Sequence, residues 1–329
     1  MDTAVAPAEL TAAFDRIMAG EATAAQVAAI LMGMRVKGET GGEVAAVVRA
    51  LQAVMVPLVA DDPGTLVDTC GTGGGSVPTF NISTAAALLA AGAGVRIAKH
   101  GNRSFTTLCG SADVLEALGV RIDVPVSVME RALRDAGIVF MYAPLMHPAM
   151  RHVGPVRREL AIPTVMNIVG PLANPARAGR QVIGVGDADR VPLLAAALAE
   201  LGTEHALVVH GEGMDEISPL GPTRVVEIRR SVVEEWTIDP GALGFKPATA
   251  EELAGGSPTD NAQAILRVLQ GQGSPGATAA VLLNAAAALY VGGVAASYEA
   301  GLGQAEAALQ AGAGMEALER LHRAMAVPP

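Results

Sequence analysis

Residues 68–84 (DTCGTGGGSVPTFNIST) combine features of a phosphate-binding loop. Four glycines fall within positions 71–75 after a strand-like run, and an Ala/Leu-rich helix begins near Asn81 and Ser83. Glycine lets backbone N–H groups approach a ligand, and a helix N-terminus offers free donors to an anion. The segment is neither a Walker loop nor a good dinucleotide fingerprint. The glycines alone leave open the alternative of a tight turn in an α/β fold.

A second cluster, Lys99-His-Gly-Asn-Arg103, directly follows the strand-like run 95–98. It puts two cations and an amide at a strand end, where they could hold a multiply charged anion. The alternative is a solvated basic turn, because charged loop residues are usually exposed. Ser111 begins the next predicted helix, so its hydroxyl could serve as a cap or as a phosphate ligand.

Residues 143–157 form a third cluster. His147, Arg151 and either Arg157 or Arg158 could face one direction on a helix that starts near Pro148. An arginine fork is a good receptor for a carboxylate. An ordinary surface helix that carries arginines is the alternative.

Asp215 and Glu216 lie in a glycine-containing loop after the strand-like run 206–209. Mg²⁺ uses one or two carboxylates and completes its shell with waters and phosphate oxygens, so this pair could bind it beside a phosphate site. No Ser-His-Asp arrangement, zinc spacing or Cys-His pair stands out. Cys70 and Cys109 are interpreted as small packing residues.

The elements that position these clusters change character along the chain. The first sixty residues are predicted to be helical, with capping-box spacing at Thr23/Gln26 and Thr40/Glu43, and residues 61–64 are predicted to be a linker. Strand-like and helix-like runs then alternate, which predicts a mainly parallel sheet with helices on both faces. The predicted strands are 66–69, 95–98, 138–142, 182–185, 206–209, 224–228 and 232–238. In such sheets, ligands gather at the carboxyl ends of the strands.

Composition narrows the function class. A net charge of −10 argues against nucleic-acid binding, which needs a basic footprint. Two cysteines are too few for a disulfide framework, and no signal peptide is predicted, so a cytoplasmic protein is expected. The nearly uncharged run 278–296 is long enough to span a bilayer, but it contains Asn284 and has no basic flank. We interpret it as a helix buried inside an α/β protein, with no membrane partner.

An ordered set of motifs resembles the anthranilate phosphoribosyltransferase family of tryptophan biosynthesis. The motifs are GTGG (71–74), FNIST (80–84), KHGNR (99–103), GSADVLEALGV (110–120), HPAMRHVGPVRREL (147–160), NIVGPLANP (167–175) and GMDEIS (213–218). The resemblance covers essentially the whole chain. It implies a nucleoside phosphorylase-like α/β fold with a mainly parallel central sheet. A small helical domain (1–63, joined by helices from about 147–180) would precede an α/β domain (64–329), and a homodimer would form through the helical domain.

The resemblance also implies an activity and a set of site residues. The enzyme would transfer the phosphoribosyl group of phosphoribosyl pyrophosphate to the amine of anthranilate, with two Mg²⁺ ions and no covalent nucleophile or obligate base. Phosphoribosyl pyrophosphate would contact Gly71, Thr72, Gly74, Gly75, Thr79, Asn81, Ser83, Thr84, Lys99, Thr106, Thr107 and Ser111. Anthranilate would contact Gly71, Asn102, Pro144, His147 and Arg157. Mg²⁺ would be held by Ser83, Asp215 and Glu216.

The chain departs from the family pattern at four positions. Gly75 replaces the aspartate that usually ends GTGGD, which puts the coordination of the second Mg²⁺ in question. Leu108 stands where a lysine is common, so a positive charge near the phosphates is lost. Met150 and Met166 replace aromatic residues, which affects the substrate channel and packing respectively.

Two other functions are weighed against this one. A nucleoside phosphorylase of the same fold would use inorganic phosphate and a free nucleoside, and the GMDEIS carboxylates and the KHGNR cluster argue against it. A non-catalytic relative that binds nucleic acid or a regulatory ligand is disfavoured by the acidic net charge.

Overall fold

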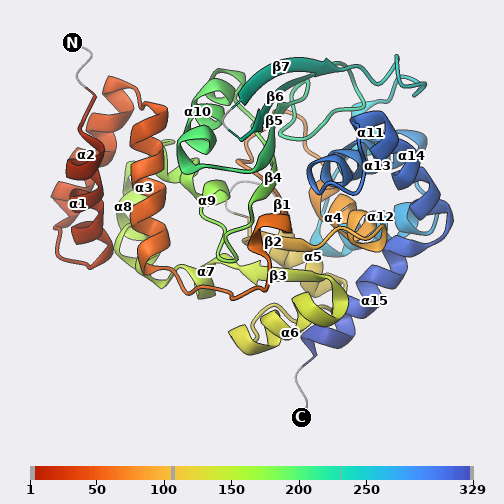
Figure 1. Cartoon of the computed structure of the whole chain (residues 1–329), viewed down its shortest axis with the longest axis horizontal. Helices are drawn as coiled ribbons and strands as arrows, with labels where there is room; N and C mark the ends of the chain where they lie inside the picture. The colour runs from red at the N-terminus through yellow and green to blue at the C-terminus, as the bar shows by residue number, and fades with distance from the viewer. Residues whose placement is uncertain (1–3, 105–107, 231, 327–329) are drawn as a thin grey trace.

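The computed structural model describes residues 4–104, 108–230 and 232–326, and across them the chain forms a seven-stranded sheet (Figure 1). The spatial strand order is β3-β2-β1-β4-β5-β6-β7. The strands are β1 (Val67–Gly71), β2 (Ile97–Gly101), β3 (Ile138–Tyr142), β4 (Arg180–Gly184), β5 (His205–His210), β6 (Thr223–Arg229) and β7 (Val232–Ile238). The first five strands in this chain order pair in parallel, while β6 and β7 add antiparallel pairs. The predicted mainly parallel sheet is confirmed.

The strand β2 differs from its predicted range. It runs two to three residues later than the predicted 95–98, so Lys99 and His100 lie inside the strand and not in a turn after it. In the parallel register Lys99 is opposite Phe140 and His100 is opposite Met141. Lys99 is tolerated inside the strand because the Thr69 carbonyl and the Ser83 hydroxyl accept hydrogen bonds from its ammonium. Local hydrophobicity does not predict such contacts, since they come from residues distant in the chain.

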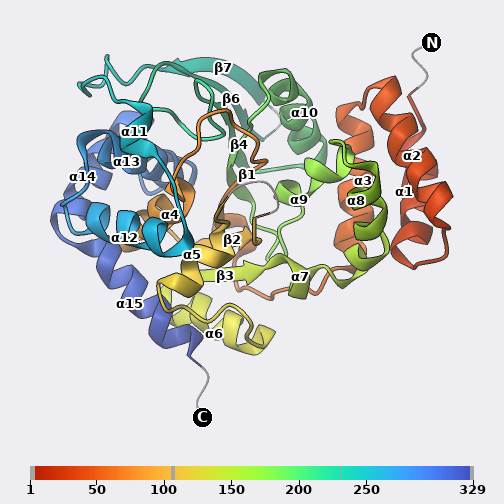
Figure 2. The same ribbon diagram turned by 180° about the vertical axis from the view of Figure 1, so that it is seen from behind.

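Helices cover both faces of the sheet (Figure 2). The buried hydrophobic residues of β4 to β6 are divided between two separate cores. One core holds α4 (Ile82–Gly92), α5 (Ser111–Ala117), α6 (Val126–Ala136), α12 (Pro258–Leu269), α13 (Pro275–Val291), α14 (Tyr298–Gln310) and α15 (Ala313–Met325). The other holds α1 (Pro7–Met18), α2 (Ala24–Lys37), α3 (Gly41–Val54), α8 (Gly154–Leu160), α9 (Val169–Leu172) and α10 (Val191–Leu201). Short helices α7 (Ala143–Met146) and α11 (Ala250–Leu253), and the 3₁₀ turns η1 (Pro63–Thr65), η2 (Pro148–His152), η3 (Val165–Asn167) and η4 (Ala188–Arg190), complete the elements.

The apolar run 278–296 forms most of the buried helix α13. The Asn284 amide donates to the Ile217 carbonyl at 2.9 Å and accepts from the Ile217 N–H at 3.1 Å. None of the helices in the described ranges has the length and hydropathy needed to cross a membrane. Residues 279–289 of the run are all buried, which explains why this part of the run is uncharged.

The N-terminal helices share their core with the sheet. Both predicted capping boxes are present, at Thr23 and Thr40. Gly41 lies against Ala196 of α10, and the Arg190 guanidinium pairs with the mostly buried Glu39 carboxylate at 2.9 Å. The apolar faces of α3 and α10 therefore close one continuous core with Ile183 and Val208 of the sheet. The division into domains at residues 63 and 64 stays a prediction.

A buried carboxylate ties the crossing segment 165–176 to the sheet. Asp68 in β1 accepts the His100 N–H at 3.1 Å and the Asn174 amide at 2.7 Å, and the same amide donates to the Ala98 carbonyl at 2.9 Å. Burial raises the pKa of Asp68 to about 6, although Lys99 and these hydrogen bonds lower it. The charged form of Asp68 is thus held in place by donors from β2 and from the crossing segment.

Asp68→Asn is expected to remove one pH-dependent component of stability. The folded pKa of about 6 lies above the ordinary value of 3.8, so the folded chain binds more protons between these values. The Asp68 contribution is therefore fully present below about pH 4 and is lost as the pH rises through about 6. Relative to Asp68→Asn, the wild-type free energy of unfolding should fall by roughly 2–3 kcal/mol between pH 4 and pH 7.

Denaturant unfolding at several pH values measures this difference. The matched control is Asp123→Asn, which removes an exposed carboxylate. Equal pH dependence in the two variants would contradict the prediction.

Candidate active site

Two glycine-containing loops pack against each other at the carboxyl ends of β1 and β5. After Gly71 the chain turns through Gly73 and Gly74, which both have positive φ (68° and 86°). The Gly73 N–H donates to Asp215 Oδ2 at 2.8 Å, and the Val77 N–H donates to the Gly213 carbonyl at 3.0 Å. The predicted glycine turn therefore holds the acidic loop directly.

The acidic loop reaches β1 because β4 ends in a glycine. In the sheet, β4 lies between β1 and β5. A Cβ on Gly184 would overlap the Asp215 carbonyl oxygen, and a Cβ on Gly71 would overlap Asp215 Oδ2. Sequence reasoning did not single out Gly184; its signal was the Gly184-Val-Gly186 pattern at the end of a strand.

A small cavity of about 20 Å³ lies where these strand ends meet. Its lining includes Thr69, Gly71, Ser83, Asp215 and Glu216. Glu216 Oε2 is buried and has no hydrogen-bond partner among the described residues. A buried carboxylate oxygen without a donor is costly, so this atom is placed to receive a cation or a donor from a ligand.

Lys99 borders the same group of residues. Its buried ammonium donates to the Thr69 carbonyl, to Thr69 Oγ1 at 3.4 Å and to Ser83 Oγ at 3.3 Å. Burial lowers the pKa of Lys99, while the nearby carboxylates, Asp68 first, oppose that change. Burial also raises the pKa of Asp215 and of Glu216, and the Asp215 charge raises that of Glu216 further.

These oxygens fit Mg²⁺. Two carboxylates and the Ser83 hydroxyl line one cavity, and Mg²⁺ takes one or two protein carboxylates together with waters and phosphate oxygens. Within the described part of the chain, no three His, Cys, Asp or Glu side chains gather as a metal site. The arrangement therefore suits a hard cation that a phosphate ligand helps to bind.

The other residues that were expected to contact phosphoribosyl pyrophosphate lie in different parts of the surrounding structure. Asn81 joins the start of α4 to the Cys109 carbonyl at 3.3 Å and to the Asn261 amide at 2.9 Å. Thr72 Oγ1 accepts the Gly186 N–H at 3.1 Å, and Thr79 makes an isolated bridge with Ala254. Gly74 and Gly75 lie in the glycine turn.

Thr84 lies apart from the cavity. Its hydroxyl is buried without a hydrogen-bond partner among the described residues, and it lines a second small cavity with Leu88 and Phe140. Thr106 and Thr107 lie outside the described residues.

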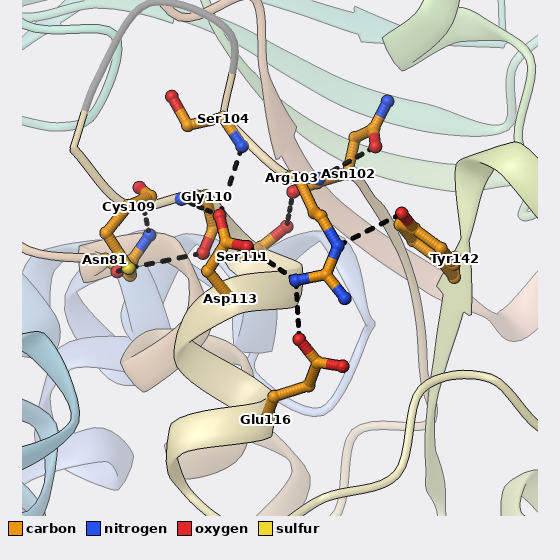
Figure 3. Close-up of polar contacts among 10 residues, drawn as sticks. All are labelled: Asn81, Asn102, Arg103, Ser104, Cys109, Gly110, Ser111, Asp113, Glu116 and Tyr142. Carbon is orange, nitrogen blue, oxygen red and sulfur yellow. Dashed lines mark hydrogen bonds and ion pairs between the residues drawn. The ribbon is translucent and has the colours of Figure 1, made fainter. Parts of the chain in front are cut away.

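Of the two cations in KHGNR, Lys99 contacts the cavity residues and Arg103 points toward acidic side chains (Figure 3). The Arg103 guanidinium pairs with Asp113 at 2.8 Å and with Glu116 at 2.6 Å. Asn102, between them in the chain, accepts the Ser111 hydroxyl at its carbonyl (3.4 Å). The two cations expected to act together thus face different partners.

The third cluster does not form a shared arginine fork. Arg151 donates to His152 at 3.1 Å, and Arg158 is exposed. Arg157 on α8 is half-buried, makes no ion pair with a described residue, and has its pKa lowered by burial. A half-buried guanidinium without an acidic partner is suited to a carboxylate ligand.

His147 is paired with His100 of β2. Their ring centroids are 5.0 Å apart, and both rings are buried. Burial lowers the pKa of His100 to about 3 and that of His147 to about 4, so both rings are neutral at pH 7. Pro144 lies nearby in sequence, in the first turn of α7.

Comparisons with known protein families identify the class of enzyme to which this chain is similar. The a/b domain of the glycosyl transferase family matches residues 63–315, and the helical bundle domain of that family matches residues 4–55. Together these matches define a glycosyltransferase built from a helical bundle and an α/β domain.

Individual relatives and solved structures identify the family within this class of glycosyltransferases. The chain is 49% identical over 311 residues to the anthranilate phosphoribosyltransferase of Roseiflexus castenholzii, covering 94% of this chain and 91% of that one. The crystal structure of anthranilate phosphoribosyltransferase from Thermus thermophilus is similar with a TM-score of 0.93 and 39% identity, covering 98% and 97% of the two chains. The Saccharomyces cerevisiae enzyme in complex with PRPP (phosphoribosyl pyrophosphate) and Mg has a TM-score of 0.87 and 25% identity, covering 97% and 93%. The chain belongs to the anthranilate phosphoribosyltransferase family.

Gly184→Ala is expected to destabilise the fold. The added Cβ overlaps a backbone oxygen of Asp215, which cannot move aside as a flexible side chain would. The free energy of unfolding should fall by at least about 2 kcal/mol, the cost of overpacking a tight site. Gly303→Ala, at an exposed helical position with open space around it, should instead raise it by up to about 1 kcal/mol.

Denaturant unfolding of both variants provides the measurement. Equal stability of Gly184→Ala and wild type would show that the approach of Asp215 to β4 is not tight.

Proposed function

We propose that this protein transfers the phosphoribosyl group of phosphoribosyl pyrophosphate to the amine of anthranilate. The products are N-(5-phosphoribosyl)anthranilate and pyrophosphate, in the second step of tryptophan biosynthesis from chorismate. The observation that carries the proposal is the cavity at the strand ends, where Ser83, Asp215 and Glu216 meet beside Lys99, in a chain of this family. A related enzyme that binds PRPP and Mg supports the same ligands here.

Pyrophosphate and the ribose phosphate would lie against the glycine turn and the start of α4. Gly71, Gly74 and Ser83 would present backbone or hydroxyl donors there, and Lys99, which lies beside Ser83, would supply a positive charge. Asn81 and Ser111 would contribute further hydrogen bonds, as would Thr72, Thr79, Thr106 and Thr107. The Thr84 hydroxyl lines the second cavity and is not included in this set. Backbone donors and a fixed cation stabilise negative charge as it grows on the leaving group.

Mg²⁺ would be held by Asp215, Glu216 and the Ser83 hydroxyl. The ion would neutralise charge on the pyrophosphate oxygens. Two ions are expected from the family, but Gly75 offers no carboxylate to the second. A Cβ on Gly75 would lie 2.8 Å from the Gly213 carbonyl oxygen and 3.1 Å from Met214 Cα, so the turn lies close to the acidic loop. We infer that the second ion depends on substrate oxygens and binds weakly.

Anthranilate would lie toward α8, with its carboxylate on Arg157 and with Asn102, Pro144, His147 and Gly71 around it. Its aromatic amine already carries a free lone pair, so the reaction needs no strong base. The neutral, buried His100 and His147 suit a pocket for an aromatic ring. The demanding step is departure of pyrophosphate from the ribose, for which an ordered site holds the amine in line and excludes water.

The proposal also covers the oligomeric state and the cellular location of the protein. A homodimer through the helical domain is supported by Val36 and Gly33, which leave an exposed apolar and small-residue face on α2. A sedimentation mass of a single chain would contradict it. The helical and α/β domains divided at residues 63 and 64, and a cytoplasmic location, stay predictions.

Adding phosphoribosyl pyrophosphate to purified protein and anthranilate should cause a loss of anthranilate fluorescence that requires Mg²⁺. The initial rate is measured over a Mg²⁺ titration, with Glu216→Gln as the variant that removes the unpartnered carboxylate oxygen. Because Glu216 is placed to hold the ion, this variant should need more Mg²⁺ to reach half its maximal rate.

Three outcomes distinguish the alternatives. No turnover and no binding of either substrate would overturn the proposal. Phosphate-dependent release of a base from a nucleoside would favour a phosphorylase. An unchanged Mg²⁺ requirement in Glu216→Gln would remove that residue from the metal site.

Arg157→Ala should raise the KM for anthranilate by roughly tenfold to a hundredfold, because a hydrogen bond to a charged group contributes about 1.5–3 kcal/mol. The KM for phosphoribosyl pyrophosphate should stay unchanged. Arg158→Ala is the matched control, since it removes the exposed neighbouring guanidinium of the same helix. Steady-state kinetics with each substrate varied provides the test, and equal anthranilate KM values in the two variants would refute the role of Arg157.

A further inference from the structure

The Arg103 guanidinium joins two elements that flank the site (Figure 3). Nη1 pairs with Asp113 Oδ1 at 2.8 Å and with Glu116 Oε2 at 2.6 Å, both on α5. Nε donates to the Tyr142 hydroxyl at 3.2 Å, at the end of β3, and Cζ lies 5.7 Å from the centre of the Tyr142 ring. A network of several charges in defined geometry stabilises more than an isolated surface pair.

The charge balance of this network separates it from the phosphate site. One guanidinium is matched by two carboxylates, Asp113 and Glu116, so the group carries a net negative charge. Such a group does not attract a phosphate. Arg103 is therefore better suited to hold protein elements than to bind an anionic substrate.

On one side, the network fixes the base of the loop that follows β2. Asp113 Oδ2 accepts the N–H groups of Gly110 at 2.9 Å and of Ser104 at 3.2 Å. The Ala112 N–H and the Ser111 hydroxyl both donate to the Asn102 carbonyl, at 3.2 Å and 3.4 Å. Asn102 and Ser111 are therefore held next to each other by the same set of contacts.

On the other side, the network reaches the corner between β3 and α7. Tyr142 is the last residue of β3 and directly precedes α7, which contains Pro144. His147 follows at the end of that helix. The Tyr142 hydroxyl thus connects Arg103 to the segment expected to border anthranilate.

Resting on the proposed function, we propose that Arg103 is a positioning residue that couples the two substrate sites. Through Asp113 it orients Ser111 and Asn102, and through Tyr142 it orients the β3–α7 corner. It contacts neither substrate. Its loss therefore weakens the binding of both substrates, whereas loss of the Tyr142 contact alone weakens the binding of anthranilate.

Four variants test the coupling in the Mg²⁺-dependent fluorescence assay, with each substrate varied in turn. Arg103→Gln removes the charge and should raise both KM values by about tenfold, a magnitude typical of coupled sites. Arg103→Lys can still pair with the carboxylates but cannot also present Nε to Tyr142. Arg103→Lys and Tyr142→Phe should therefore share one phenotype, a raised anthranilate KM with an unchanged phosphoribosyl pyrophosphate KM.

The double variant Arg103→Gln/Tyr142→Phe should be no worse than Arg103→Gln alone, because the two residues act through one contact. Arg121→Gln is the control. It removes an exposed arginine whose ion pair with Asp123 measures 4.0 Å, and it should behave as wild type. The melting temperature of each variant is measured in parallel.

The outcomes separate this inference from the proposed function. Absence of turnover in the wild type overturns both. With an active wild type, three results overturn the inference alone: Arg103 variants that match Arg121→Gln, a lowered melting temperature with unchanged KM values, or additive effects in the double variant.

Discussion

The close approach of the Asp215 backbone to Gly184 is the constraint on which the site depends. Parallel strands bring their carboxyl ends to one edge, but β5 is separated from β1 by β4. Only a strand that ends without a side chain lets the acidic loop cross above it and reach the glycine turn. The Gly73 N–H then fixes Asp215, and the Ser83 hydroxyl at the start of α4 completes the group of oxygens.

Two buried charged side chains near this close approach are hydrogen-bonded to neighbouring residues. Asp68 and Lys99 both lie in the sheet and are nearly inaccessible to solvent. Each is held by donors or acceptors from neighbouring strands, which makes a charged interior tolerable. Glu216 differs from them, since one of its oxygens is buried without a described partner. This unpartnered oxygen marks the place where a ligand would supply the missing donor or cation.

The sequence predicted those parts of the fold and the site that depend on residues close together in the chain. Period and turn residues predicted a mainly parallel sheet, the capping boxes at Thr23 and Thr40, and the order of strand, glycine turn and helix around Ser83. It was less informative where contacts are distant in the chain. The pairing of Arg103 with Glu116, the approach of Asp215 to Gly184 and the inclusion of Lys99 in β2 all depend on tertiary packing. Composition and periodicity do not predict which charged side chains contact each other in the folded chain.

The core shared by α3, α10 and the sheet has a consequence for the modularity of the chain. The bundle matches a family segment of its own, yet it contributes one wall of a core whose other wall is the sheet. Separating the two would uncover the apolar face of α10 and leave the Arg190 guanidinium without Glu39. The N-terminal bundle is thus not an interchangeable appendage, and substitutions on either side of this seam must remain compatible with the other.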